Sequence, residues 1–289
     1  MIATYAFFSV KGGVGKSALA SAAGVASARL NRPVAVVDAD LTGTSLADGL
    51  ALRAPGPGPD GAIAWVGARP ASLDRRETLR RRRDEAEAET PHSVPFYDVL
   101  INRSPRPEFD PATIAWTHDD HPGVRWYPSS PAPRETADSV RSMMRSANFG
   151  NRVLGSLGRI RESLGPEGVL LVDLPPGMFG VGTWVASLPE LTPVLVTTDD
   201  RNDLYRSAHE FVRLLRAFPS TRWLLNRNHR APEEVRRDLR SYLDNLLPGL
   251  ENKLRVVGRE ADLERLFRED SLRVSQPLAD RLVQLLEDT

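Results

Sequence analysis

The sequence predicts an α/β fold, in which a doubly wound and mostly parallel sheet carries helices on both faces. Three observations indicate this class. Short apolar runs alternate with longer amphipathic segments along the chain, as in consecutive βαβ units. A glycine-rich loop joins the first apolar run to the first helical segment. Two later apolar runs end in aspartates, Asp38 and Asp173, which is where ligands bind in sheets of this kind.

Each element follows from its local pattern. Compact apolar runs indicate strands, and apolar residues that recur at helical spacing indicate helices. The expected strands, in chain order, are Thr4–Val10, Val34–Asp38, Val124–Tyr127, Val169–Leu174, Val194–Thr197, Trp223–Asn226 and Leu254–Val257. The expected helices are Lys16–Leu30, Glu135–Leu164 (with a break considered near Asn148–Gly150), Asp203–Phe218, Pro232–Leu246, Ala261–Phe267 and Pro277–Leu286.

Residues 53–123 differ from the rest of the chain. They contain PGPGPDG at 55–61 and the charged run DRRETLRRRRDEAEAE at 74–89, but few apolar runs. We expect an irregular, Pro- and Arg-rich surface excursion from one domain that spans residues 1–289. In the charged run the arginines come first and the acids last, against the helix dipole. A bound partner or a disordered loop would therefore explain that run better than an intrinsically stable helix.

Composition excludes several kinds of site. The chain has no cysteine, so it cannot form disulfides, thiolate zinc sites, iron–sulfur ligation or a cysteine nucleophile. Its formal net charge is zero, which provides no global field for nucleic acid or an anionic membrane, although a local patch stays open. No apolar stretch is long enough to span a membrane. The short apolar start lacks a basic region before it, and we expect a cytoplasmic protein.

The glycine loop SVKGGVGKSAL, residues 9–19, predicts phosphate binding. Its glycines let backbone N–H groups converge on phosphate oxygens, and the helix after it points its positive end there. Lys16 can then reach the terminal phosphates, and the Ser17 hydroxyl can ligate Mg²⁺. The chain has only three lysines among its 38 basic residues, and Lys11 and Lys16 flank this loop. A compact ammonium suits a narrow glycine cradle better than a planar guanidinium.

A dinucleotide-binding interpretation competes with this one. Gly13, Gly15 and Ala18 satisfy the G-x-G-x-x-G/A fingerprint, and Asp38 lies about 20 residues beyond them. An NAD(P)-dependent oxidoreductase is therefore kept as a remote alternative, although it does not account for Lys11, Lys16 or Ser17.

Carboxylates at two strand ends fit a metal and a water. In VVDAD, residues 36–40, the alternation of a strand puts Asp38 and Asp40 on one side. In VLLVDLPPG, residues 169–177, Asp173 ends an apolar run and fits a Walker B aspartate that holds a metal-bound water. The two prolines and the glycine after it force a non-helical loop, a natural switch II.

The strict P-loop pattern requires glycine at position 10, where this chain has Val10; the segment that stands here, KGGVGKS, resembles the deviant Walker A loop of the ParA/MinD family of P-loop ATPases. The resemblance, which covers about residues 3–50 and 124–289, implies a P-loop NTPase fold. It makes Lys11 the signature lysine, which reaches the nucleotide of a second subunit in a face-to-face dimer. TTDD at 197–200 takes the place of the family's usual TTP, with Asp199 where the proline stands.

The resemblance also implies roles for single residues. It places Asp38 in the metal shell, Asp40 at the attacking water and Asn226 at the adenine edge. The catalytic residues are then Lys11, Lys16 and Asp40, and the metal residues are Ser17, Asp38 and Asp173. The nucleotide-binding residues are Gly12, Gly13, Val14, Gly15, Lys16, Ser17, Ala18 and Asn226.

The expected function is Mg²⁺-dependent ATP hydrolysis, slow without a partner, by a homodimer whose ATP state controls partner or surface binding in a positioning, partitioning or regulatory role. The cofactors are ATP and Mg²⁺, and an unidentified protein partner is expected. One alternative is a Mrp-type scaffold or carrier, because DADLTGTSLADGL resembles that branch, but such carriers use a cysteine pair that is missing here. Another is a conflict-system regulatory NTPase whose partner binds residues 53–123.

DNA and a membrane are the two candidate surfaces on which the protein could work. Nonspecific DNA binding is left open by scattered arginines, although solvated helix faces are the default for such residues; these arginines are Arg222, Arg227, Arg230, Arg236, Arg237 and Arg240. Membrane binding is disfavoured, because the C-terminal helix is flanked mostly by acidic residues. Its stripe is expected to pack in the core instead; the stripe is Leu278, Leu282, Leu285 and Leu286.

Overall fold

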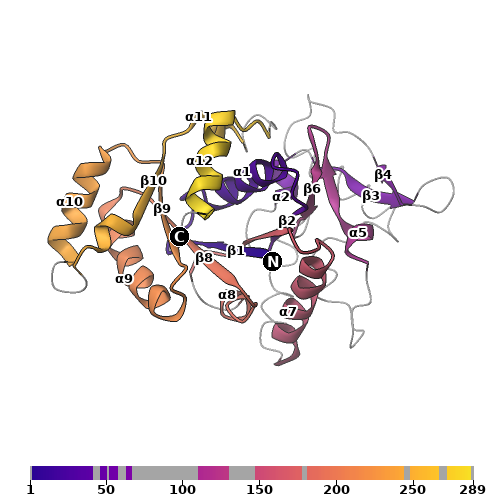
Figure 1. Cartoon of the computed structure of the whole chain (residues 1–289), viewed down its shortest axis with the longest axis horizontal. Helices are drawn as coiled ribbons and strands as arrows, with labels where there is room; N and C mark the ends of the chain where they lie inside the picture. Colours follow the sequence, from indigo (N-terminus) through magenta and orange to yellow (C-terminus); the bar gives the residue numbers. More distant parts are fainter. Residues whose placement is uncertain are drawn as a thin grey trace.

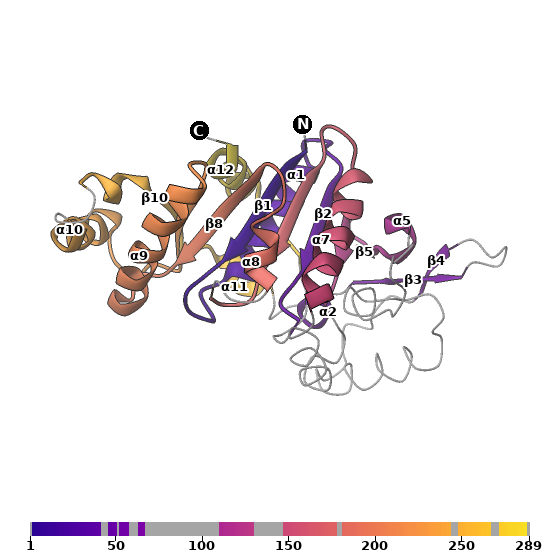
Figure 2. The same ribbon diagram turned by 90° about the horizontal axis from the view of Figure 1, so that it is seen from below.

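The computed structural model describes residues 2–41, 46–50, 52–57, 63–66, 110–129, 147–177, 181–243, 248–266 and 272–287. These form an eight-stranded sheet in the order β10-β9-β8-β1-β7-β2-β6-β5, with helices on both faces (Figures 1 and 2). All neighbours are parallel except β5, which is antiparallel to β6. The predicted fold class is therefore confirmed.

Seven strands of the main sheet begin and end close to the expected positions, and the eighth, β5, was not predicted. They are β1 (Ala3–Phe8), β2 (Val34–Asp38), β5 (Trp116–His118), β6 (His121–Tyr127), β7 (Val169–Asp173), β8 (Leu191–Thr197), β9 (Arg222–Asn226) and β10 (Leu254–Gly258). A separate antiparallel pair consists of β3 (Ala54–Pro57) and β4 (Ile63–Val66). Figure 1 shows this pair at the end of the molecule opposite to α10.

The helices are α1 (Lys16–Ala28), α2 (Leu46–Gly49), α5 (Pro111–Ile114), α7 (Ala147–Glu162), α8 (Val181–Val185), α9 (Arg201–Ala217), α10 (Pro232–Leu243), α11 (Ala261–Arg265) and α12 (Gln276–Glu287). A short 3₁₀ helix spans Leu250–Lys253. One hydrophobic cluster packs α1, α11 and α12 on one face of the sheet. A second cluster packs α7, α8, α9 and α10 on the other face.

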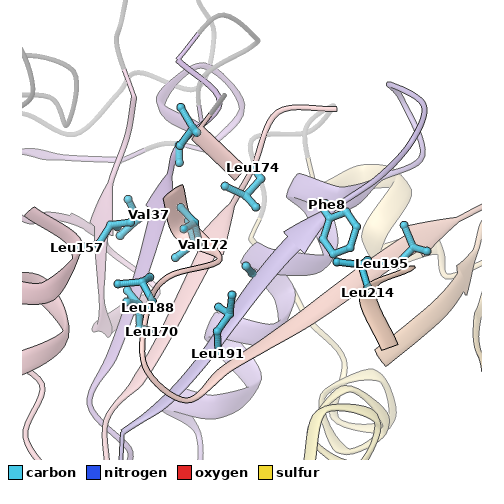
Figure 3. Close-up of a cluster of buried hydrophobic side chains, with 14 of the residues drawn as sticks. Phe8, Val37, Leu157, Leu170, Val172, Leu174, Leu188, Leu191, Leu195 and Leu214 are labelled. Carbon is cyan, nitrogen blue, oxygen red and sulfur yellow. The ribbon is translucent and has the colours of Figure 1, made fainter. Parts of the chain in front are cut away.

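The central strands are buried on both faces, which explains why their sequences are continuous apolar runs. On β1, Ala6 and Phe8 face the α7–α10 side, whereas Tyr5 and Phe7 face the α1–α12 side. Figure 3 shows the cluster on the α7–α10 side, where Phe8 lies with leucines and valines from β2, β7, β8, α7 and α9. This packing fixes the carboxyl ends of β1, β2 and β7 at one edge of the sheet.

Several elements were not predicted. Residues 110–123 differ from an irregular surface segment, because α5 and β5 lie there and β5 extends the main sheet at its β6 edge. Trp116 and Ile114 are buried. The charged run at 74–89 and residues 135–146 of the expected helix lie outside the described residues, and α7 runs unbroken from Ala147. That residues 1–289 form one domain stays a prediction.

The leucine stripe of the C-terminal helix packs in the core, as expected. Leu278, Leu282 and Leu286 on α12 are buried in the cluster that also contains α1, and Leu285 is half-buried against it. Among the described residues, no helix combines the length and the apolar character that crossing a bilayer requires.

Candidate nucleotide site

The glycine loop connects the end of β1 to the start of α1. Gly13 and Gly15 have φ angles of 79° and 87°, in the left-handed region that strains other residues. Gly15 precedes α1, and within the described residues no side chain caps this helix end. A Cβ added at Gly15 would lie 2.4 Å from Nδ2 of Asn226. The loop therefore needs glycine at positions 13 and 15 for their positive φ angles, and at position 15 also because Asn226 leaves no room for a Cβ.

Lys16 points into the protein at the ends of the central strands. Its side chain is only 6% exposed, and its ammonium forms an ion pair with the carboxylate of Asp173 at the end of β7. Asp173 is the register partner of Phe7 on β1 and of Asp38 on β2. The structure therefore brings the expected P-loop lysine and two of the expected metal residues to one place.

Asp38 is fully buried and accepts three hydrogen bonds. The donors are the backbone N–H groups of Asp40 (3.0 Å) and Leu46 (2.9 Å) and the hydroxyl of Ser129 (3.0 Å). Burial, and secondly the charge of Asp173, raise the pKa of Asp38 to about 8. A divalent cation would favour the ionised form of Asp38.

These residues fit Mg²⁺. The described residues hold no cluster of three or more His, Cys, Asp or Glu side chains that could bind a metal. Mg²⁺ does not need one, because it usually takes one or two carboxylates, with phosphate oxygens and waters completing its shell. Asp38 and Asp173 are adjacent in register, and Ser17 is the second residue of α1 beside Lys16. All three offer the oxygen atoms that Mg²⁺ prefers.

The DLPPG segment, predicted to be switch II, lies against the glycine loop. The N–H of Gly177 donates to the carbonyl of Ser9 (2.7 Å). A Cβ on Gly12 would lie 3.7 Å from Cγ of Pro176. Of the segment expected as switch I, residues 42–45 lie outside the described part of the chain. Asp40, at its start, is half-buried just beyond β2.

A family model matches part of the sequence, and solved structures match the fold. The family model described as ParA, NUBPL iron-transfer P-loop NTPase, matches residues 2–63. Three solved structures each cover 99% of the chain. A ParA family ATPase from Chlorobium tepidum TLS is 17% identical over 99% of its own chain, with a TM-score of 0.59. The structure of the MinC:MinD cell division protein complex of Aquifex aeolicus matches with 17% identity over 97% of its own chain and a TM-score of 0.56. A putative plasmid partition protein from Borrelia burgdorferi B31, bound to AMPPNP, matches with 15% identity over 98% of its own chain and a TM-score of 0.57.

The chain has the ParA/MinD fold. The resemblance to the ParA/MinD family is thereby confirmed, by sequence for residues 2–63 and by fold for the chain as a whole. No curated protein is similar enough in sequence to count as a match.

The ParA/MinD strand order argues against the dinucleotide-binding alternative. In that other fold β1 and β2 are neighbours. Here β7 lies between them, because β1 pairs with β7 and β8, and β2 pairs with β7 and β6. Asp38 consequently lies beside Asp173, where it meets the carboxylate that pairs with Lys16.

Lys11 and Asn226 occupy different surroundings in this ParA/MinD fold. Lys11 is exposed on the glycine loop, and its predicted action on a second chain stays a prediction. Asn226 is 1% exposed, and its Nδ2 donates to the carbonyl of Val14 (2.9 Å). Its buried Oδ1 has no hydrogen-bond partner among the described residues. The amide therefore supports the glycine loop and has a free acceptor; its predicted adenine contact stays a prediction.

Sequence reasoning missed Arg227 as a member of this site. Its guanidinium donates to the carbonyl of Gly13 (2.6 Å). On sequence alone it belongs with the scattered arginines that leave DNA binding open, and its position directly after Asn226 is the only signal that it joins this site. Other arginines of that group also pair within the chain: Arg230 with Asp238, Arg236 with Glu233 and Arg240 with Glu251.

Proposed function

We propose that this chain is a Mg²⁺-dependent ATPase that works as an ATP-controlled homodimeric switch of the ParA/MinD type. The observation that supports this best is the meeting of Lys16, Asp38 and Asp173 at the carboxyl ends of β1, β2 and β7, beneath a glycine loop. The fold and the match to residues 2–63 make a P-loop ATPase the appropriate class. Partner control, dimerisation and slow basal turnover belong to the proposal.

The chain's own residues supply binding, charge and orientation. The N–H groups of the glycine loop and of the first turn of α1 bind the phosphates. Lys16, held at the site by Asp173, carries the charge that the terminal phosphates need. Bound Mg²⁺, held through Ser17, Asp38 and Asp173, would neutralise charge on the phosphate oxygens. Asp40 orients the attacking water, because phosphoryl transfer to water depends chiefly on positioning.

Lys11 acts on the nucleotide of the second subunit. It is exposed and lies five positions before Lys16 on the same loop. In a face-to-face dimer, each chain could therefore present its Lys11 to the phosphates bound by the other chain. There it would stabilise the negative charge that develops during hydrolysis, as an arginine finger does in trans. Loss of the terminal phosphate then releases the switch segments and changes partner affinity.

Solution mass tests the dimer. The Asp40→Ala variant removes the water-orienting carboxylate, and we expect it to accumulate as an ATP-bound dimer in multi-angle light scattering with Mg²⁺. The Lys11→Ala variant should bind ATP and stay monomeric. A monomeric Asp40→Ala protein with nucleotide bound would refute the dimer and leave nucleotide binding intact.

One alternative has an observation in its favour. The family model that matches residues 2–63 is described as an iron-transfer P-loop NTPase, which agrees with the Mrp-like wording of residues 38–50. The absence of cysteine from the whole sequence weighs against it, because such carriers use thiolates at the dimer interface. Iron uptake by the purified, reconstituted protein would favour the carrier over the switch.

A further inference from the structure

The loop after β9, residues 227–231, contacts the glycine loop across an intervening strand. In the sheet, β8 lies between β9 and β1. Two side chains nevertheless connect the loops that follow β9 and β1. Arg227 donates to the carbonyl of Gly13 (2.6 Å), and Asn226 donates to the carbonyl of Val14 (2.9 Å).

Those two carbonyls set the direction of the N–H groups that would meet phosphate. In a trans peptide the C=O of one residue and the N–H of the next point in opposite directions from one plane. A donor on the Gly13 carbonyl therefore fixes the N–H of Val14, and a donor on the Val14 carbonyl fixes the N–H of Gly15. Glycines at 13 and 15 cannot hold these planes themselves, because they have no side chains and wide conformational freedom.

The loop after β9 is itself held by hydrogen bonds on both sides. On the β8 side, one oxygen of Asp199 accepts from the backbone N–H groups of His229 (2.5 Å) and Arg230 (2.8 Å). On the β10 side, the N–H of Arg227 donates to the carbonyl of Gly258 (3.2 Å). Arg227 has a φ of 53°, a conformation that a non-glycine residue keeps only where its surroundings impose it.

Asp199 differs from the neighbouring carboxylates because it accepts hydrogen bonds from a loop that follows another strand. Asp200 caps α9 by accepting from the N–H of Asp203 (3.0 Å). Asp203 accepts from Thr197 and Thr198 at the end of β8. The hydrogen bonds of Asp200 and Asp203 stay within one stretch of chain, whereas Asp199 reaches the loop that follows another strand. It stands where the family resemblance predicts proline, which could not accept these bonds.

We propose that Asp199 and Arg227 are positioning residues for the nucleotide: Asp199 sets the β9–α10 loop, and Arg227 from that loop aims the glycine-loop N–H groups at the phosphates. The inference rests on the proposed function, since it concerns the same site. Neither residue is assigned a chemical step. A loop that is already in its binding conformation loses less conformational entropy when the ligand arrives, so this support should appear as nucleotide affinity.

The test is a double-mutant cycle read by calorimetric titration with AMPPNP and Mg²⁺. Arg227→Ala and Asp199→Ala should each weaken binding about tenfold, the usual scale of one charge-assisted hydrogen bond. Because both act through one loop, the double variant should lose little more than either single variant. Arg227→Lys keeps one donor and should recover part of the affinity.

The control is Asp200→Asn, which removes a neighbouring charge but keeps an oxygen that caps α9; its affinity should match the wild type. Melting temperatures are measured in parallel. Absence of AMPPNP binding by the wild-type protein would refute the proposed function itself. Normal wild-type binding together with undiminished binding by Asp199→Ala refutes this inference alone. The inference is also overturned if the double variant loses the product of the two single losses in affinity, about a hundredfold. It is overturned as well if the losses of affinity merely follow a lowered melting temperature.

Discussion

Asp38, Asp173 and Lys16 bring two carboxylates and one ammonium together where little of their surface is exposed. One positive charge cannot offset two buried negative ones, which is why burial and Asp173 raise the pKa of Asp38 to about 8. The residue types and their strand-end positions were predictable from the sequence. The ion pair and the hydrogen bond from Ser129 were not, because their partners lie 157 and 91 residues apart.

This arrangement predicts how stability depends on pH without metal and nucleotide. The unfolded chain ionises Asp38 near its ordinary value of 3.8, whereas the folded chain keeps the proton until about pH 8. Between these values the folded state binds more protons, so stability falls as pH rises and levels off above about 8. We expect a loss of at least about 1 kcal/mol from pH 5 to 8, or roughly 2–4 °C in Tm.

Thermal melts across this pH range check the slope, and Asp38→Asn should flatten it because the titrating group is gone. A wild-type Tm that rises steadily from pH 5 to 8 would contradict the raised pKa of Asp38.

At the scale of elements, the fully buried strands could be predicted from the sequence and the short elements could not. β2 and β7 are buried on both faces, so each is a continuous apolar run that ends in an aspartate. β5 has only three residues, too few for a strand pattern to show. β3 has the sequence APGP, and its two prolines disfavour a strand assignment. α2 and α8 are four and five residues long, too short for helical periodicity to show. Arg227 entered the site only through a contact 214 residues away in sequence.

Two glycines, Gly15 in the glycine loop and Gly155 on α7, offer a matched pair of substitutions. Gly15→Ala forces alanine into a φ of 87° and a Cβ into contact with Asn226. We expect it to abolish nucleotide binding and to lower stability by about 1–3 kcal/mol. Gly155→Ala on α7 meets nothing within 4 Å and should stabilise the helix by up to about 1 kcal/mol. Calorimetric titration and urea unfolding measure both effects; normal binding by Gly15→Ala would contradict the described loop.

For the whole molecule, the structure bears on which surface could serve the switch. The leucine stripe of α12 is buried against α1, which removes it as a membrane anchor. Of the arginines considered for DNA, Arg230, Arg236 and Arg240 pair with carboxylates and Arg227 supports the glycine loop. These contacts lower the positive charge that the four described arginines offer to a phosphate backbone.

We therefore expect no shift of duplex DNA in gel electrophoresis at physiological salt, with or without ATP. Nonspecific binding is governed by free cationic side chains and weakens steeply with salt. An ATP-dependent shift that disappears as salt is raised would restore DNA as the working surface.

The central claim is that the chain binds ATP with Mg²⁺ through Lys16 and the glycine loop, and calorimetric titration tests it most directly. The wild-type protein should take up one ATP per chain in the presence of Mg²⁺. Lys16→Ala, which loses the ammonium, should show no uptake, and NAD should give no heat with either protein. Binding of NAD without binding of ATP would contradict the account and restore the hydride-transfer alternative.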